Sequence, residues 1–137
     1  MKYLHSGYIL FCAKAEHAED GHINAMGLFD LCTGDHLPLM MKCDCVFGFG
    51  TPYERRQYRG TITIEDPTGK ELACHEFNAN DPNDLFKGHY ILPLDLTITT
   101  EGSHTARVVL QNWKNENVWE VTRQFWAMVV GDAHPDP

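Results

Sequence analysis

The feature that most constrains the fold of this chain is the alternation of apolar and polar residues with a period of two. The clearest example ends at Phe49 and places seven apolar side chains at every second position: Leu37, Leu39, Met41, Cys43, Cys45, Phe47 and Phe49. Successive side chains of a β-strand point to opposite faces, so this stretch predicts a strand with one buried face and one wet face. No window of the chain keeps the i, i+3, i+4, i+7 apolar spacing of an amphipathic helix. The pattern therefore predicts an all-β protein.

A second alternating stretch contains an unusual proline. Its apolar positions are Tyr90, Leu92, Leu94, Leu96 and Ile98. Pro93 lies on the opposite face and has no N–H to donate to a strand ladder. We therefore expect this strand to lie at the edge of a sheet or to contain a bulge at Pro93.

Turn residues separate the alternating stretches at intervals typical of hairpins. The turns are expected at residues 19–21, 66–69, 101–102 and 114–117, and the strands at 7–15, 22–31, 37–49, 61–65, 71–77, 90–98, 105–112 and 118–130. The polar segment from Asn78 to Lys87 is expected to cross from one sheet to the other, with a short helical turn at 83–86. Strands at this spacing with one apolar face usually close as two packed antiparallel sheets. The sequence predicts a single antiparallel β-sandwich of about eight strands, with a Greek-key arrangement as an option.

The strongest turn signal is Asp66-Pro67-Thr68-Gly69. Proline suits the second position of a type I turn, and glycine adopts a positive φ at no steric cost. We expect Gly69 to have a positive φ and Thr68 to contribute little to stability. The alternation predicts that Ile62 and Ile64 face the core before the turn, and that Leu72 and Cys74 face it afterwards.

The length of 137 residues fits one domain. With 43% hydrophobic and 22% charged residues the composition is that of an ordinary globular protein. Residues 1–130 are predicted to form the domain, and the proline-rich end, residues 131–137, a frayed tail.

The charge balance narrows the range of partners. Nineteen acidic residues against eleven Lys and Arg give a net charge of −8, which repels phosphate backbones and anionic lipids. We therefore expect no nucleic acid partner and no membrane. The short apolar run near the N-terminus lacks the features of a secretory signal, and five cysteines do not form an even disulfide framework. The expected compartment is the cytoplasm, where thiols stay reduced.

Cysteines and histidines are the first candidates for a metal site. Cys43 and Cys45 share one face of a strand and could supply two sulfur ligands, but that face is the apolar one. We expect all five cysteines to be small core residues. The eight histidines include no H-x-H or H-x3-H pair, and we expect no cofactor.

Two acidic loops offer an alternative, a divalent-cation site of the calcium type. Their oxygen donors are Glu16, Glu19 and Asp20 in the first loop and Asn80, Asp81, Asn83 and Asp84 in the second. Such residues also favour solvated turns, so the loops would have to meet in space to form a site.

Catalytic patterns are scarce. The chain has two serines, Ser6 and Ser103, and each stands beside a histidine. Adjacent strand residues point to opposite faces, so neither pair suits a nucleophile and its base. A small hydrolase remains the third option, behind a non-enzymatic module.

Aromatic and arginine side chains are compatible with an ordinary strand or loop whose arginines extend into solvent. Their alternative role is a surface that binds protein, since both are enriched at interfaces. The candidates are Tyr53, Arg55, Arg56, Tyr58 and Arg59 in one patch, with Trp119 and Trp126 in the last strand. That strand is apolar on both faces, which requires a central position or a partner that covers it. The leading hypothesis is a non-enzymatic module that binds another protein or itself.

Several motifs resemble a family of short prokaryotic and metagenomic proteins catalogued as a domain of unknown function. They are the first strand Tyr8-Ile9-Leu10-Phe11-Cys12, the turn Glu19-Asp20-Gly21, the second strand from Ile23 to Asp30 with Gly27-Leu28-Phe29-Asp30, and the hairpin Asp66-Pro67-Thr68-Gly69-Lys70. His22 stands where the family usually has Lys, and Leu37-Pro38 where it often has Phe-Pro. The resemblance covers about the first half of the chain, implies a single β-sandwich and carries no activity.

Overall fold

A computed structural model describes residues 7–19, 22–49, 58–78 and 89–130. This part of the chain contains nine strands and no helix. The strands are β1 (Gly7–His17), β2 (Ile23–Phe29), β3 (Leu31–Gly34), β4 (Leu39–Phe49), β5 (Arg59–Glu65), β6 (Glu71–Asn78), β7 (His89–Ile98), β8 (Gly102–Gln111) and β9 (Asn117–Val129). The expected helical turn at 83–86 lies outside the described residues, as does the tail 131–137.

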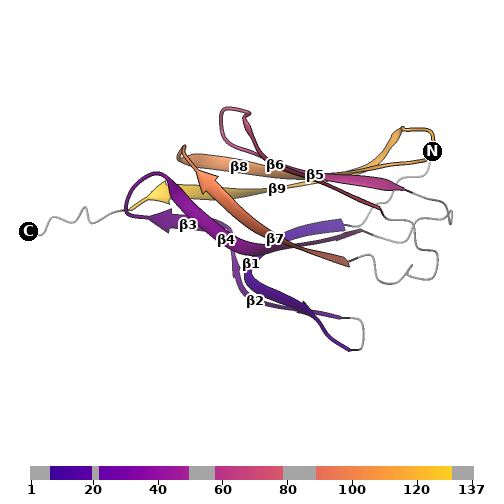
Figure 1. Ribbon diagram of the computed structural model, residues 1–137, viewed down its shortest axis with the longest axis horizontal. Coiled ribbons are helices and arrows are strands. Elements are labelled where there is room, and N and C mark those ends of the chain that lie inside the picture. The colour runs from indigo at the N-terminus through magenta and orange to yellow at the C-terminus, as the bar shows by residue number, and fades with distance from the viewer. Residues whose placement is uncertain (1–6, 20–21, 50–57, 79–88, 131–137) are drawn as a thin grey trace, which may run out of the picture.

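The strands form two sheets that face each other as layers of a sandwich (Figure 1). One sheet has the order β2-β1-β4-β7, and the other β3-β9-β8-β5-β6. The predicted all-β sandwich is confirmed. β6 and β7 belong to different sheets, so the chain passes from one sheet to the other between them as expected, although residues 79–88 themselves lie outside the described residues. Among the described pairs, β3 with β9 is parallel, whereas the prediction had antiparallel pairs throughout.

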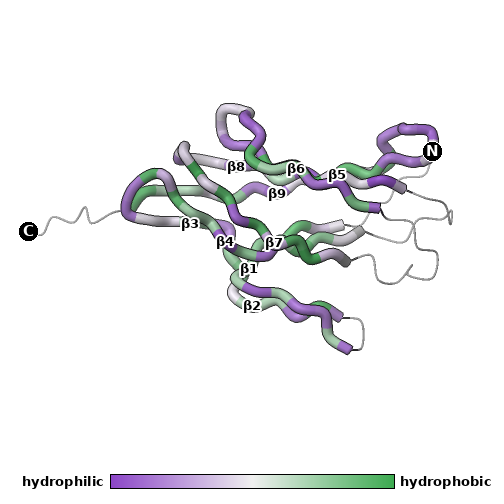
Figure 2. The backbone as a smooth tube through the Cα atoms, viewed as in Figure 1, coloured by the Kyte–Doolittle hydropathy of each residue, from purple (hydrophilic) through white to green (hydrophobic). Residues whose placement is uncertain are grey.

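The core lies between the sheets and follows the predicted alternation, which Figure 2 shows as changes of hydropathy along the strands. In β4 the buried positions include Met41, Cys43, Cys45 and Phe47. In β7 they are Leu94, Leu96 and Ile98, which pair with buried β4 residues across the ladder. Burying this apolar area contributes about 25 cal/mol per Å². β7 ends its sheet, so the prediction of an edge strand at Pro93 is confirmed.

The sequence prediction of one strand over 22–31 was wrong because the chain changes sheets there. β2 ends at Phe29 and pairs with β1, whereas β3 begins at Leu31 and pairs with β9. Asp30 lies at the break, and its carbonyl accepts a hydrogen bond from Trp126 N at 2.8 Å. The apolar alternation continues through the break, so the pattern alone gives no sign of it.

The hairpin between β5 and β6 has the predicted turn. Gly69 has a φ of 90°, and its N–H donates to the Asp66 carbonyl at 3.0 Å. One carboxylate oxygen of Asp66 accepts from Thr68 N, Thr68 Oγ1 and Lys70 N at 2.8, 2.6 and 3.0 Å. These bonds hold the pKa of Asp66 below its usual value, the Thr68 hydroxyl contributing most. Thr68 therefore donates two hydrogen bonds within the turn, which the sequence pattern did not predict.

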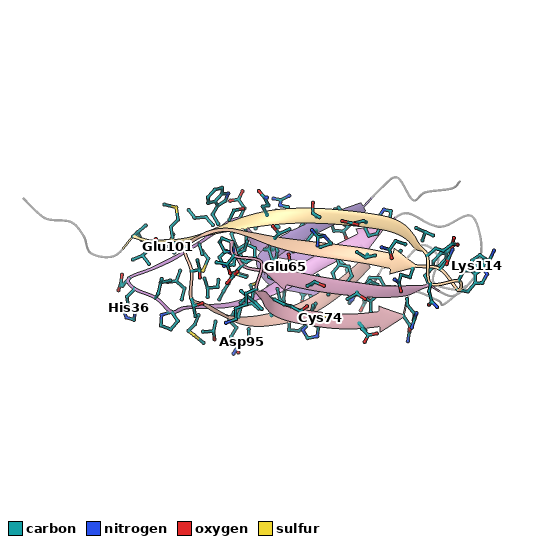
Figure 3. All side chains as sticks on the ribbon, turned by 90° about the horizontal axis from the view of Figure 1, so that it is seen from above. His36, Glu65, Cys74, Asp95, Glu101 and Lys114 are labelled. Atoms are coloured by element: carbon teal, nitrogen blue, oxygen red, sulfur yellow. The ribbon has the colours of Figure 1, made fainter. Side chains whose placement is uncertain are left out.

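Cys74 was expected to face the core, and this was wrong. The ladder pairs Ile64 with Ala73 and Glu65 with Glu71, so an irregularity leaves Leu72 as the extra residue. A bulge of one residue turns the following side chains to the other face. Cys74 is consequently exposed on β6, at the rim of the sheet (Figure 3).

Candidate interaction surface

The residues predicted to form an interaction surface do not lie together. Tyr58 and Trp119 are only 8% and 6% exposed, so the prediction that both lie on the surface was wrong. Arg59 is exposed and donates a hydrogen bond from Nη2 to Asn115 Oδ1. Trp126 is 51% exposed. Tyr53, Arg55 and Arg56 lie outside the described residues.

The two tryptophans of β9 differ because they stand an odd number of positions apart, which places them on opposite faces of the strand. Trp119 packs in the core with Phe125 and Ala127 on the same face. Gly7 lies so close to the Trp119 indole that a Cβ on Gly7 would come within 1.9 Å of Trp119 Cζ2. Trp119 is therefore an anchor between the two sheets.

Four large apolar side chains gather on the outer side of the sheet, at the end of β9 that pairs with β3. They are Leu31 (47% exposed), Trp126 (51%), Met128 (44%) and Val130 (51%). We call these four residues the β3–β9 surface. The sequence had placed Trp126, Met128 and Val130 on one face, and this is confirmed.

The parallel pairing of β3 with β9 assembles this surface. Leu31 is the register partner of Trp126, and Thr33 is the partner of Met128. Val130 N donates to the Gly34 carbonyl at 2.9 Å, which extends the ladder past the end of β9. Sequence analysis missed Leu31, because only this pairing, across a long separation in the chain, brings it beside Trp126.

The β3–β9 surface and the Tyr58–Arg59 group lie at opposite ends of the sandwich. Tyr58 contacts Trp113 edge-on, with ring centroids 6.5 Å apart, next to the turn between β8 and β9. Figure 3 shows Lys114 of that turn far from Glu101. Glu101 belongs to the β3–β9 end, where its Oε1 accepts from Val129 N at 2.7 Å. The two groups therefore do not form one continuous surface.

Three of the cysteines lie in the interior. Cys12, Cys43 and Cys45 are buried, which confirms the expectation for the strand pair in β4. Burial raises the pKa of Cys43 to about 12, and it also raises the pKa values of Cys12 and Cys45. Thiols with raised pKa values are poor nucleophiles and poor metal ligands, because the thiolate is the reactive form. Cys32 is half-buried, and burial raises its pKa as well.

Ser103 and His104 do not form a catalytic pair. His104 is fully buried between the sheets and stacks on Phe125, with centroids 5.0 Å apart. Its Nδ1 lies 3.0 Å from the Gly102 carbonyl. Ser103 precedes it on the strand and is the register partner of Trp126, on the outer face. The separation onto two faces agrees with the sequence argument against a nucleophile and base here.

An open pocket of about 430 Å³ lies where β1 separates from β4. Lys42, Asp44 and Asp95 provide its charged groups. One Asp44 carboxylate oxygen accepts a hydrogen bond from Ala15 N at 2.8 Å, so this side chain links β4 to the part of β1 that lies beyond their ladder. The pocket is thus explained by the strand geometry.

The acidic loops give no metal site within the described part of the chain. Glu16 and Glu19 are exposed at the end of β1 and just after it. The other candidates, Asp20, Asn80, Asp81, Asn83 and Asp84, lie outside the described residues. In the described ranges, no three His, Cys, Asp or Glu side chains converge as metal ligands would. The same ranges hold no helix that could span a bilayer.

The sequence matches the model of a family of unknown function, DUF6941, over residues 7–128. The chain belongs to this family. The resemblance carried by the opening strands and the Asp66–Lys70 hairpin is thus confirmed at the level of a family of unknown function, and the match extends through both sheets of this DUF6941 member. No curated protein matches the sequence.

Solved structures similar to the DUF6941 chain include three proteins of low sequence identity. CopC from Methylosinus trichosporium OB3b is 16% identical, with 77% of this chain and 90% of that chain covered and a TM-score of 0.38. A CARDB domain from Pyrococcus furiosus, solved in complex with di-metal ions, is 13% identical, with 95% and 94% covered and a TM-score of 0.42. The soluble domain of PmoD from Methylocystis sp. ATCC 49242 is 14% identical, with 90% of both chains covered and a TM-score of 0.44.

Proposed function

We propose that this chain is a protein-binding module that acts without catalysis in the cytoplasm and docks its partner on the β3–β9 surface. Five free cysteines, three of them buried without a disulfide, support a reducing compartment. The net charge of −8 supports a protein partner over a nucleic acid.

The observation that carries the proposal is the exposure of Trp126 among other apolar side chains. Solitary exposed apolar residues are common on soluble proteins, whereas contiguous groups mark interaction sites. Trp and Met are enriched at protein interfaces, and Trp often contributes most of the binding energy. Trp126 with Met128 and Leu31 has this composition, on two strands joined by a backbone ladder.

The neighbouring residues fit the centre of an interface. Thr33 and Ser103 are the register partners of Met128 and Trp126, and both are small and uncharged. The charged residues Asp30 and Glu101 lie beyond the ends of the paired segments. An apolar centre with charges at its rim is the usual anatomy of a protein interface.

A photo-crosslinking experiment tests this proposal. A photoreactive phenylalanine analogue replaces Trp126 in one variant and Trp113 in a matched control, since Trp113 is similarly exposed (43%) at the other end of the sandwich. Irradiation in cells of the source organism should give polypeptide adducts at position 126 and few at position 113. Adducts of equal yield at both positions, or none at 126, would contradict a docking surface at Trp126.

A charge substitution provides the second readout. Trp126→Glu should remove the adducts formed by a photoreactive group at position 128, because the apolar centre is lost. The melting temperature should change little, since the side chain is half exposed and faces away from the core. A variant that keeps its adducts would show that Trp126 contributes nothing to docking.

A further inference from the structure

The four strands that end the two sheets differ in how well they resist pairing with another chain. Open edges are usually protected by charges, prolines, bulges or very short strands. β7 contains Pro93 and Asp95, and β2 contains Gly27, which has a φ of 72°. β6 carries Glu71 and Glu76 and pairs with its neighbour through a bulge. β3 is only four residues long, but Leu31–Gly34 contains no charge and no proline, and its ladder to β9 has no bulge.

The backbone groups of β3 that point outward follow from its ladder. The carbonyls of Asp30 and Gly34 accept hydrogen bonds from Trp126 N and Val130 N, so they point toward β9. Backbone groups of successive strand residues point to alternate sides. The N–H and C=O groups of Leu31 and Thr33 therefore point away from the sheet, where a further strand could pair with them.

These groups suit a second copy of the same strand. In an antiparallel pair centred on Cys32, Leu31 of each chain exchanges two hydrogen bonds with Thr33 of the other, so all outward groups of both strands are used. A register shifted to centre on Leu31 or on Thr33 uses only one of these two residues in each chain. The centred register is symmetric, as a two-fold dimer requires.

We propose that two copies of this chain associate edge to edge through β3, with the two-fold axis at Cys32. The two five-stranded sheets then become one continuous sheet. Because Leu31 and Thr33 share the outer face with Trp126 and Met128, the β3–β9 surfaces of both copies become one apolar surface across the axis. This inference goes beyond the proposed function, because the second copy pairs with the edge of β3 and the joined apolar surface stays open for the docked partner.

The geometry at the axis makes the proposal easy to test. Cys32 of one chain faces the partner's Cys32 as a pair without hydrogen bonds, for which Cα atoms lie about 4.5 Å apart. That separation is within the range of about 4.4 to 6.8 Å found for disulfides. An oxidant such as copper phenanthroline should therefore join the two chains at Cys32.

The parent for this test is Cys74→Ser, because Cys74 is an exposed thiol that could form adventitious disulfides. Light scattering should give a mass that rises with concentration toward twice the 15.6 kDa of one chain. Oxidation should give a covalent dimer on a non-reducing gel. Adding Cys32→Ser should abolish the covalent dimer and leave the mass in light scattering unchanged.

A charged substitution on β3 distinguishes specific pairing through this strand from non-specific association. Thr33→Glu should raise the dimer dissociation constant roughly tenfold or more, because it adds like charges on both sides of the axis next to Asp35. Thr97→Glu is the matched control on the exposed side of β7 and should leave the dissociation constant unchanged. Higher salt should strengthen the dimer by screening the repulsion between two chains of net charge −8.

Two outcomes overturn the inference in distinguishable ways. A monomer at all concentrations, or a dimer that Thr33→Glu and Thr97→Glu weaken equally, refutes pairing through β3. If photoreactive position 126 then forms adducts with a different polypeptide, docking on the β3–β9 surface stands while the second copy is rejected. If position 126 forms no adduct with any chain, the proposed function fails as well.

Discussion

Replacing Gly69 by alanine tests whether backbone conformation at this turn stabilises the fold. Gly69 has a φ of 90° and lies directly after the Asp66-Pro67-Thr68 corner. A Cβ added there would have no heavy atom within 4 Å. Any loss of stability must therefore come from backbone strain, since packing is not disturbed.

The magnitude follows from two opposing terms. An L-residue with a left-handed backbone costs about 1 to 2 kcal/mol, because its Cβ approaches the carbonyl oxygen. Replacing glycine also reduces the entropy of the unfolded chain, which offsets about 0.5 kcal/mol. We expect Gly69→Ala to lower the free energy of unfolding by about 1 kcal/mol. Gly69→Asn should cost less, because Asn tolerates this region of φ and ψ.

Urea unfolding, followed by tryptophan fluorescence, measures this difference. The midpoint should fall for alanine with an unchanged slope, since the surface exposed on unfolding is the same. The corresponding fall in melting temperature is about 4 °C. Strain at this position would be refuted if Gly69→Ala had the same urea midpoint as the wild type. It would also be refuted if Gly69→Asn were less stable than Gly69→Ala.

The remaining predictions concern packing and thiols. Gly60→Ala should cost about 1 to 3 kcal/mol, more than Gly69→Ala, because its Cβ would lie 2.1 Å from Phe77 Cζ; equal urea midpoints for the two variants would contradict this packing. A maleimide should label Cys74 in the native protein well before Cys43, because the latter is buried and its pKa is raised; simultaneous labelling, detected by peptide mass spectrometry, would disprove the burial. Because the folded-state pKa of Cys43 is raised from 9.0 to about 12, its contribution to stability is complete below pH 9 and is lost as the pH rises toward 12. Urea midpoints from pH 8 to 11 should therefore fall more steeply in the wild type than in Cys43→Ala. If the midpoints of both proteins fell in parallel with pH, the raised pKa of Cys43 would be contradicted.

Alternation predicted the sandwich because it reports directly which face of a strand is buried. The same reasoning placed Cys43 and Cys45 correctly in the core. It failed at Cys74, since a bulge shifts the alternation by one residue and leaves the composition of the strand unchanged. The break at Asp30 was also hidden, because the residues on both sides continue an apolar pattern suited to either sheet.

The candidate surface was only partly predictable for a related reason. Trp119 and Trp126 lie on opposite faces of β9, so the sequence could have shown that at most one of them faces outward. Which one does so depends on where the other sheet lies, and that is tertiary information. Leu31 became part of the surface through a parallel ladder to a distant strand, for which no local pattern exists.

The parallel ladder between β3 and β9 also determines when the fold can be completed during synthesis. Leu31 and its partner Trp126 are 95 positions apart in the sequence. A ribosome that adds 5 to 20 residues per second needs roughly 5 to 20 s to cover that distance. Throughout this time the nascent chain has made β3 but not the strand on which it pairs. The open edge and its leucine are then available to other nascent chains until the last strand has been made.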